Sequence, residues 1–146
     1  MKNVLDKISS LNKKTHVVGV NYNAESRSGS VKYNNEIKLH RAIGSFKGHE
    51  EIVRAYLVSR LVNELDYEAR FIELEKEYEA GRPKPIKPRI DVILRDKENN
   101  IYFFIEVKSP EKWEADQELI EGQLFQLAKL EPRPIKYLVH YTADSN

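Results

Sequence analysis

Apolar residues recur at every fourth position between residues 49 and 65, in the segment HEEIVRAYLVSRLVNEL. This spacing places them on one face of an α-helix, and three further apolar residues widen that face. Glu50 and Glu51 fall in the first turn, where the helix dipole favours negative charge. The pattern therefore predicts a helix over residues 49–65 with a broad buried face formed by Val53, Tyr56, Leu57, Val58, Leu61, Val62 and Leu65.

The periodicity changes after this helix. Residues 69–78 alternate apolar and acidic side chains, which predicts a strand. Residues 90–94 and 101–108 are two β-rich runs around a short polar turn, which predicts a β-hairpin. A second apolar stripe predicts a helix over residues 112–129, and residues 135–141 fit a final strand. The order α-β-β-β-α-β predicts an α/β fold with a mixed β-sheet flanked by helices.

The pattern before residue 49 is weaker. Residues 3–12 fit a short helix, whereas residues 15–45 mix short apolar runs with a polar stretch and predict irregular structure with one or two short strands. A length of 146 residues fits a single domain. We therefore expect residues 1–48 to form an N-terminal extension that packs on a core formed by residues 49–146.

The composition narrows the class of protein. Apolar residues make up 40% and charged residues 32% of the chain, as in soluble globular proteins. No run approaches the ~18 consecutive apolar residues of a membrane span, and the N-terminus lacks the apolar region of a signal peptide. The chain has no cysteine, which excludes disulfides, thiolate metal sites and cysteine nucleophiles. These features fit a cytoplasmic protein without membrane association.

The net charge is only +1, but the positive charge is unevenly distributed. Residues 1–48 contain nine Lys or Arg residues and three acidic residues, a net charge of +6. The segment GRPKPIKPR at residues 81–89 adds four cations and no acid. Such patches can attract the phosphate backbone of DNA, although ordinary solvated surface is the simpler explanation. The candidate DNA contacts in the second patch are Arg82, Lys84, Lys87 and Arg89.

Candidate catalytic residues lie on the two strands of the predicted hairpin. Because side chains alternate along a strand, Glu106 and Lys108 point to the same side as Phe104, while Val107 points into the core. Asp91 lies on the partner strand, about 4.8 Å away. If the register is right, it faces Glu106. Two carboxylates this close repel each other unless a cation neutralises them.

This arrangement suits phosphodiester hydrolysis. Carboxylate oxygens are ligands for Mg²⁺, for which Mn²⁺ substitutes, and the backbone carbonyl of Val107 can add another. The metal acts as a Lewis acid and acidifies bound water, and the Lys108 ammonium can orient that water and stabilise developing negative charge. The alternative for Glu106 and Lys108 is an exposed salt bridge worth at most ~1 kcal/mol. For Asp91 it is a strand-end residue that hydrogen-bonds a nearby loop.

Two residues on the predicted helices extend the candidate site. Glu51 can provide a third acidic contact to the metal, directly or through a water, and compensation of the helix dipole is its alternative role. Gln123 can hydrogen-bond a DNA phosphate or the catalytic lysine, and a solvated helix position is its alternative.

In order and spacing, the residues from 49 to 141 resemble the N-terminal nuclease domain of type I restriction enzyme restriction subunits and of related single-chain restriction-modification proteins. The pieces that match are Glu50–Arg54 with Leu57 and Leu61, Asn63–Tyr67, Gly81-Arg82, Arg89–Val92, Phe104–Pro110 and Glu121–Phe125. They cover about two thirds of the chain, and residues 1–48 match no family motif.

The resemblance implies a restriction-endonuclease-like PD-(D/E)-x-K core and a Mg²⁺-dependent endonuclease acting on double-stranded DNA. By position it assigns catalysis to Asp91, Glu106 and Lys108, the acid of the first helix to Glu51, with Glu50 a close alternative, and the motif glutamine to Gln123. Two positions depart from the family pattern. Ile90 replaces the usual proline before the aspartate, and Leu127 replaces the tyrosine of the glutamine motif, which weakens the DNA-contact assignment.

The resemblance also implies partners, because such domains usually belong to a larger assembly with a motor ATPase or a methyltransferase and specificity component. This chain lacks a phosphate-binding Gly-x-x-x-x-Gly-Lys-Ser/Thr loop, so the motor would lie elsewhere. No organic cofactor is expected. The chain then corresponds to an excised domain or a stand-alone relative. The alternative function is a non-catalytic DNA-binding or assembly module on the same fold.

Overall fold

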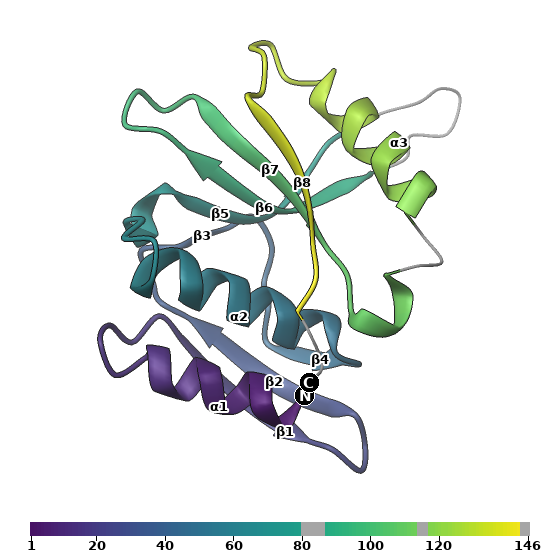
Figure 1. The fold of residues 1–146 in the computed structure, drawn as a ribbon. Helices are drawn as coiled ribbons and strands as arrows, with labels where there is room; N and C mark the ends of the chain where they lie inside the picture. Colours follow the sequence, from purple (N-terminus) through teal and green to yellow (C-terminus); the bar gives the residue numbers. More distant parts are fainter. Residues whose placement is uncertain (80–86, 114–116, 144–146) are drawn as a thin grey trace.

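The computed structural model describes residues 1–79, 87–113 and 117–143. Figure 1 shows how its helices and strands are arranged. In chain order these elements are α1 (Lys2–Leu11), β1 (Val18–Asn23), β2 (Ser28–Tyr33), β3 (Lys38–Leu39), β4 (Ser45–Lys47), α2 (Glu50–Asn63), the 3₁₀ turn η1 (Ala69–Phe71), β5 (Ile72–Glu77), β6 (Arg89–Arg95), β7 (Ile101–Val107), the 3₁₀ turn η2 (Pro110–Lys112), α3 (Gln117–Ala128) and β8 (Tyr137–Tyr141).

The strands form two sheets, with helix α2 between them (Figure 1). The larger sheet has the order β3-β5-β6-β7-β8 and is mixed, because β3 and β8 pair in parallel with their neighbours while β5, β6 and β7 pair antiparallel. The smaller sheet, β1-β2-β4, is antiparallel. The α/β class and the mixed sheet predicted from the sequence are therefore confirmed.

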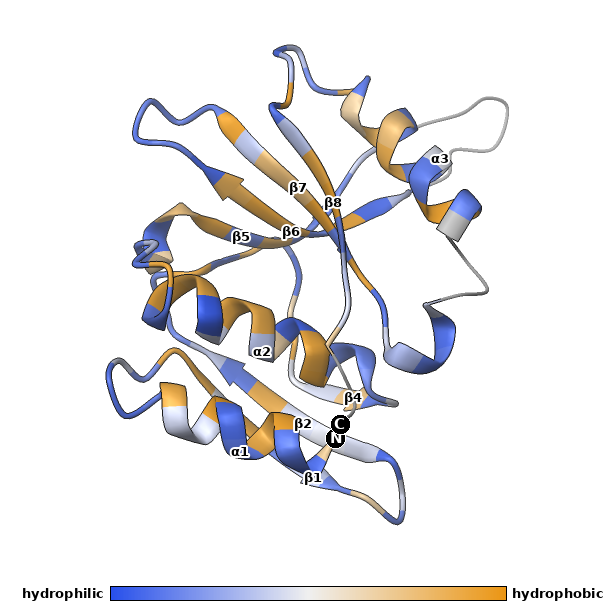
Figure 2. Ribbon diagram, in the orientation of Figure 1, coloured by the Kyte–Doolittle hydropathy of each residue, from blue (hydrophilic) through white to orange (hydrophobic). Residues whose placement is uncertain are grey.

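Helix α2 is buried on nearly all sides rather than along one stripe. Ile52, Val53, Ala55 and Val58 are fully inaccessible to solvent, although they point in different directions around the helix. Figure 2 shows the apolar character of α2 between the two sheets. One face packs on the large sheet, and the other packs on α1 and the small sheet. The helix ends at Asn63, two residues earlier than predicted, because the chain then turns to the surface.

The region of residues 15–45 is more regular than the sequence predicted. In place of irregular structure with one or two short strands, it contains the β1–β2 hairpin, with Val18 paired to Tyr33 and Asn23 paired to Ser28, the short strand β3 and the start of β4. Its apolar side chains, including Val18 and Val31, are buried against α2. The prediction failed because these strands gain their stability from a tertiary contact with α2 and not from a strong local pattern.

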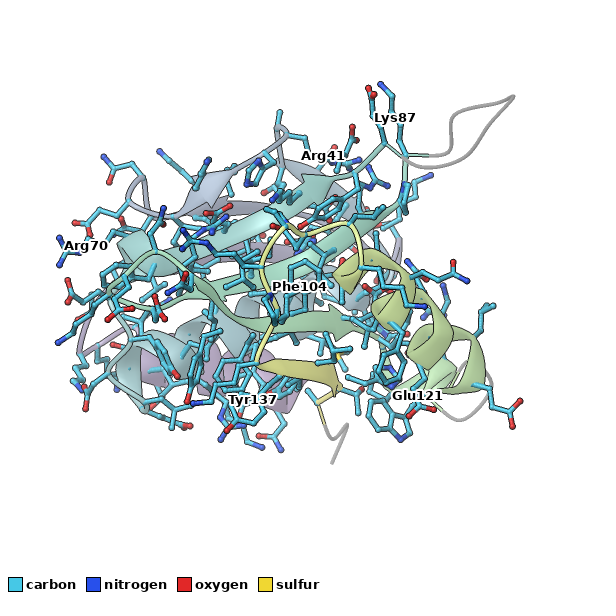
Figure 3. The ribbon with its side chains drawn as sticks, turned by 90° about the horizontal axis from the view of Figure 1, so that it is seen from above. Arg41, Arg70, Lys87, Phe104, Glu121 and Tyr137 are labelled. Carbon is cyan, nitrogen blue, oxygen red and sulfur yellow. The ribbon has the colours of Figure 1, made fainter. Side chains whose placement is uncertain are left out.

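Helix α3 covers the opposite face of the large sheet. Ile120, Leu124 and Leu127 pack there on Ile93 and Phe104, while Ile105 and Val107 face α2. Phe104 is fully buried near the middle of the sheet (Figure 3). Both faces of β7 are therefore core, which means that Glu106 lies in an interior position instead of on an open face.

Within the described ranges, no helix has the length and apolar composition needed to cross a bilayer.

Candidate active site

Strands β6 and β7 separate where Asp91 lies. Their ladder runs from Arg95↔Ile101 to Val92↔Ile105 and ends there. Beyond that point β6 continues to pair with β5, through Lys76↔Ile90, whereas β7 continues to pair with β8, through Glu106↔His140. The sheet thus opens into a fork between two of its central strands.

Asp91 fills the base of this fork. Its Oδ2 atom accepts a hydrogen bond of 2.7 Å from the backbone N–H of Val107. The carboxylate therefore satisfies a strand donor that has no ladder partner on β6. This geometry places the Asp91 carboxylate beside the Glu-x-Lys strand, although not through the simple cross-strand pairing expected from the sequence.

The two carboxylates of the fork, Asp91 and Glu106, repel each other. Burial raises the pKa of Asp91, and the negative charge of Glu106 raises it further. Burial also raises the pKa of Glu106, although Lys108 opposes that shift. Glu106 is 5% exposed, and its Oε2 atom is buried and accepts no hydrogen bond within the described part of the chain. The pair therefore binds a positive charge, either a proton or a metal ion, more readily than exposed carboxylates do.

Lys108 provides the nearest positive charge to Glu106. Its Nζ atom lies 2.9 Å from Glu106 Oε1 and 3.8 Å from Glu50 Oε2. Burial acts to lower the pKa of Lys108, but the hydrogen bond and the charge of Glu106 prevail and raise it. The side chain is therefore a protonated donor at neutral pH, suited to stabilise negative charge rather than to remove a proton.

A buried arginine that the sequence analysis missed lies at the centre of the neighbouring acids. Arg54 of α2 forms close ion pairs with Glu51 and with Glu75 of β5, and its Nη1 atom lies 3.5 Å from Asp91 Oδ1. Its side chain is only 8% exposed. Because Glu51 precedes Arg54 by about one helical turn, their spacing in the sequence could have predicted this ion pair. No spacing of that kind indicated the contact with Glu75.

Glu51 is held by this network rather than by Glu106 or Lys108. Its Oε1 atom accepts a hydrogen bond of 2.7 Å from the Tyr33 hydroxyl and one of 3.2 Å from Arg54 Nε. Burial, followed by the charge of Glu51, raises the pKa of Tyr33 well above its usual value, so the hydroxyl remains a donor. The Oε2 atom accepts from Arg54 Nη2, so both oxygens of Glu51 already have partners.

Glu75 has an unusual backbone conformation that serves the same network. Its φ angle is +59°, in the left-handed region that non-glycine residues rarely adopt. Leu74 and Glu75 consequently both reach the α2 side of the sheet, where a regular strand would send them to opposite sides. Strain of this kind costs about 1–3 kcal/mol and is concentrated at functional sites.

Asp91, Glu51, Arg54 and Glu75 line a cavity of about 290 Å³, whereas the Glu106 and Lys108 side chains are not part of its lining. Acids and cations alternate around it, and part of its wall comes from the segment before α2. The lining residues are Arg41, Ala42, Ile43, Ser45, Phe46, Lys47, Glu50, Glu51, Arg54, Glu75, Arg89, Asp91 and Val107.

The fork fits a divalent cation by its chemistry. Asp91 and Glu106 offer carboxylate oxygens, one of which is buried without a hydrogen bond, and a hard cation prefers such ligands. Across the described residues, no three His, Cys, Asp or Glu side chains are grouped closely enough to form a complete metal site. A metal held there would therefore take its other ligands from backbone carbonyls, water or substrate.

Of the remaining predicted site residues, Arg89 lines the same cavity as Asp91, and the others lie apart from the fork or outside the described residues. Gln123 is half-buried on α3, and its side chain makes no hydrogen bond within the described ranges, so it is not joined to Asp91 or Lys108. Arg89 Nε lies 3.5 Å from Glu75 Oε2, and Lys87 is exposed. Arg82 and Lys84 lie outside the described residues.

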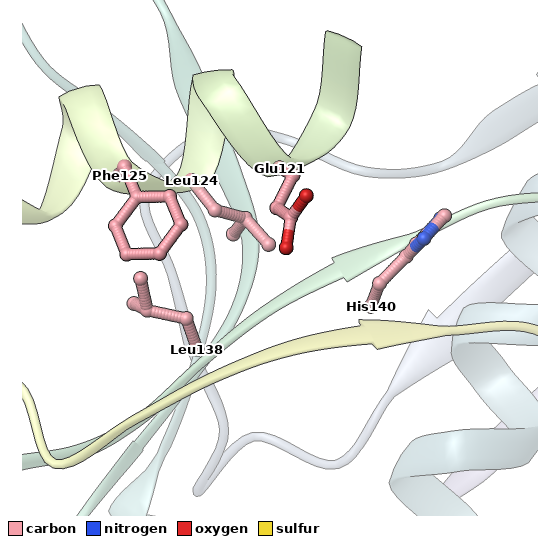
Figure 4. A pocket seen from close by; sticks show the side chains of 5 residues that line it. All are labelled: Glu121, Leu124, Phe125, Leu138 and His140. Atoms are coloured by element: carbon pink, nitrogen blue, oxygen red, sulfur yellow. The ribbon is translucent and has the colours of Figure 1, made fainter. Parts of the chain in front are cut away.

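A second cavity, of about 260 Å³, lies between α3 and β8 (Figure 4). Leu124 and Phe125 project into it from α3 opposite Leu138 of β8, and Glu121 lies toward His140. Its lining is mostly apolar and offers one carboxylate instead of a pair. The first cavity is therefore the better candidate for metal-assisted chemistry.

A family model described as "Type I restriction enzyme R protein N terminus" matches residues 49–139. The match begins just before α2 and ends in β8, so it includes both arms of the fork and excludes the small sheet. No curated protein matches the chain.

Proposed function

Because the chain belongs to the family of type I restriction enzyme R protein N-termini, we propose that it is the nuclease domain of a type I-like restriction-modification system. In this proposal it hydrolyses phosphodiester bonds of double-stranded DNA and depends on Mg²⁺, for which Mn²⁺ substitutes. The observation that supports it most directly is the under-neutralised pair Asp91 and Glu106 beside the protonated Lys108. The motor ATPase and the methyltransferase-specificity component would be provided by other parts of the system.

Asp91, Glu106 and the backbone carbonyl of Val107 are the proposed metal ligands. A divalent cation bound there supplies Lewis acidity toward a phosphate oxygen and lowers the pKa of a bound water. Glu51 has both oxygens engaged with Tyr33 and Arg54, so its proposed contribution is through a water rather than by direct ligation.

Lys108 has two tasks in this proposal. Its hydrogen bond to Glu106 fixes the direction of that carboxylate. Its ammonium, 17% exposed, also donates to an incoming phosphate oxygen or to the attacking water as negative charge develops in the transition state. Glu106 in turn keeps the lysine protonated, which the raised pKa of Lys108 reflects.

Plasmid cleavage tests the proposal. We expect nicking or linearisation with Mg²⁺ or Mn²⁺, and a loss of about 100-fold or more in Asp91→Ala and in Lys108→Ala, because each removes a group used in the transition state. Lys97→Ala, in the turn at the far end of the hairpin, is the matched control and should keep full activity. Cleavage that survives in both site variants would refute the assignment.

Metal binding separates an inactive nuclease from the alternative function. Mn²⁺ titration followed by calorimetry should show binding to the unmodified protein and none to Asp91→Ala. An isolated domain that binds Mn²⁺ but cleaves slowly would agree with a nuclease that needs its motor. DNA binding without Mn²⁺ uptake would instead indicate a non-catalytic DNA-binding or assembly module.

A further inference from the structure

Part of the candidate active-site wall comes from residues that the family match leaves out. The segment 41–47 lines the same cavity as Asp91 and Glu51, whereas the match begins at residue 49. This wall is anchored on both sides. Ile43 and Phe46 pack against the core, and β4 pairs with β2 through Gly29↔Phe46 and Ser28↔Lys47.

The wall presents two cations to the cavity. Arg41 is 48% exposed, and its Nε atom lies 3.3 Å from Glu75 Oε2. A guanidinium has five N–H donors, so this contact leaves most of them available. Lys47 is exposed and has no ion pair among the described residues. On the strand side of the cavity, Arg89 is 40% exposed and also lies beside Glu75.

The exposed charges of the lining are mostly positive. Asp91, Glu51, Glu75 and Arg54 are buried or largely buried, whereas the more exposed charged members are three cations, Arg41, Lys47 and Arg89, and one acid, Glu50. A DNA strand entering the cavity would therefore meet more positive than negative charge first. Its phosphates carry one negative charge each, and cations at the rim gain affinity by releasing the counterions of the DNA.

We propose that Arg41 and Lys47 form a phosphate clamp that holds the DNA backbone next to the phosphate being cleaved. This inference rests on the proposed nuclease function and assigns a role to residues 41–47. The clamp binds through charge and donor geometry, so it contributes affinity and positioning but no recognition of base sequence. Arg41 and Lys47 are therefore positioning residues and take no part in the bond-breaking step.

DNA binding by a double variant tests the clamp. We would measure the anisotropy of a short fluorescein-labelled duplex in EDTA with the full chain and with Arg41→Gln/Lys47→Gln, between about 50 and 200 mM KCl. The slope of log K against log salt concentration should fall in magnitude by about 0.9 for each lost phosphate contact, so by nearly 2 in the double variant.

Arg70→Gln/Lys97→Gln is the matched control, since it removes the same charge from the other end of the sheet. Arg70 is 63% exposed and, like Arg41, has an acidic neighbour, while Lys97 lies in the β6–β7 turn. Figure 3 shows Arg70 at the opposite end of the molecule from Lys87, with Arg41 nearer Lys87. The control should keep the slope of the unmodified protein. If both double variants change the slope equally, only net charge matters and the clamp is wrong.

Two further measurements separate this inference from the nuclease assignment. Mn²⁺ affinity and melting temperature should be unchanged in Arg41→Gln/Lys47→Gln, because neither residue belongs to the metal pair. An unchanged salt slope, together with loss of cleavage in Asp91→Ala and Lys108→Ala, refutes the clamp and leaves the nuclease assignment intact. Absence of duplex binding by the unmodified protein also refutes the clamp.

Discussion

Replacing Arg54 with methionine should cost a large part of the stability of this domain. The guanidinium is 8% exposed and is the shared partner of Glu51 and Glu75, with Asp91 at 3.5 Å. Methionine keeps much of the side-chain volume but removes the cation of Glu51 and leaves Glu75 with only the more exposed Arg41 and Arg89. Removing one partner of a buried ion pair typically costs about 3–5 kcal/mol. Since small domains are stable by about 5–15 kcal/mol, the variant should fold but melt roughly 10 °C lower.

Arg60→Met on the same helix is the control for this measurement. Arg60 pairs with Glu64 at 2.6 Å, but the pair is more than a third exposed, so its loss should cost less than about 1 kcal/mol. Urea denaturation of both variants, followed by circular dichroism, gives the two free energies of unfolding. Equal and small losses would show that Arg54 does not balance buried charge.

The pH dependence of the free energy of unfolding provides an independent check on the Arg54→Met variant. Without Arg54 the carboxylates around it should have higher pKa values in the folded state than in the unfolded state. The folded variant then binds more protons than its unfolded chain, so its stability rises as the pH falls. The loss in free energy of unfolding, relative to the unmodified protein, should therefore be larger at pH 8 than at pH 5. A loss that grows toward acid pH would contradict this reasoning.

Three further predictions concern the fork and the packing around it. Mg²⁺ should raise the melting temperature more at pH 8 than at pH 5.5, because the raised pKa values of Asp91 and Glu106 let protons compete with the metal; equal shifts in a thermal-shift assay would argue against metal binding by this pair. Phe104→Ala should lower the free energy of unfolding by about 3–5 kcal/mol in urea, and a loss under about 1 kcal/mol would disagree with its full burial. Gly29→Ala should destabilise by about 1–3 kcal/mol, because the added Cβ would lie 2.2 Å from the Asn21 carbonyl oxygen and 2.8 Å from the Phe46 ring; a neutral result in the same assay would contradict the close packing of β1, β2 and β4.

The elements with a strong period were predictable from the sequence. Helix α2 and the β6–β7 hairpin lie where the 3.6-residue and two-residue patterns placed them, within two residues at each end. The small sheet was not predictable, because its strands are short and partly polar and gain their stability from the second face of α2. A helix that is apolar on two sides needs two packing partners, and the broad apolar face of α2 was evidence in the sequence for a second partner.

The polar residues of the site were harder to predict than its fold. Alternation along residues 69–78 predicted a strand but gave no sign that Glu73 and Glu75 are both buried. Glu73 is paired with Arg95 and His40, and Glu75 with Arg54. Such pairings depend on residues far apart in the chain, so no local pattern reveals them.

The positions of Arg54 and Lys108 are the physical reason for expecting a metal ion at the fork, between Asp91 and Glu106. Arg54 compensates Glu51 and Glu75 at close range but reaches Asp91 only at 3.5 Å. Lys108 compensates one oxygen of Glu106, and the other is buried without a hydrogen bond in the described part of the chain. The excess negative charge is therefore concentrated between Asp91 and Glu106. The other two arginines of the lining, Arg41 and Arg89, pair with Glu75, which is why we expect the exchangeable divalent ion between Asp91 and Glu106.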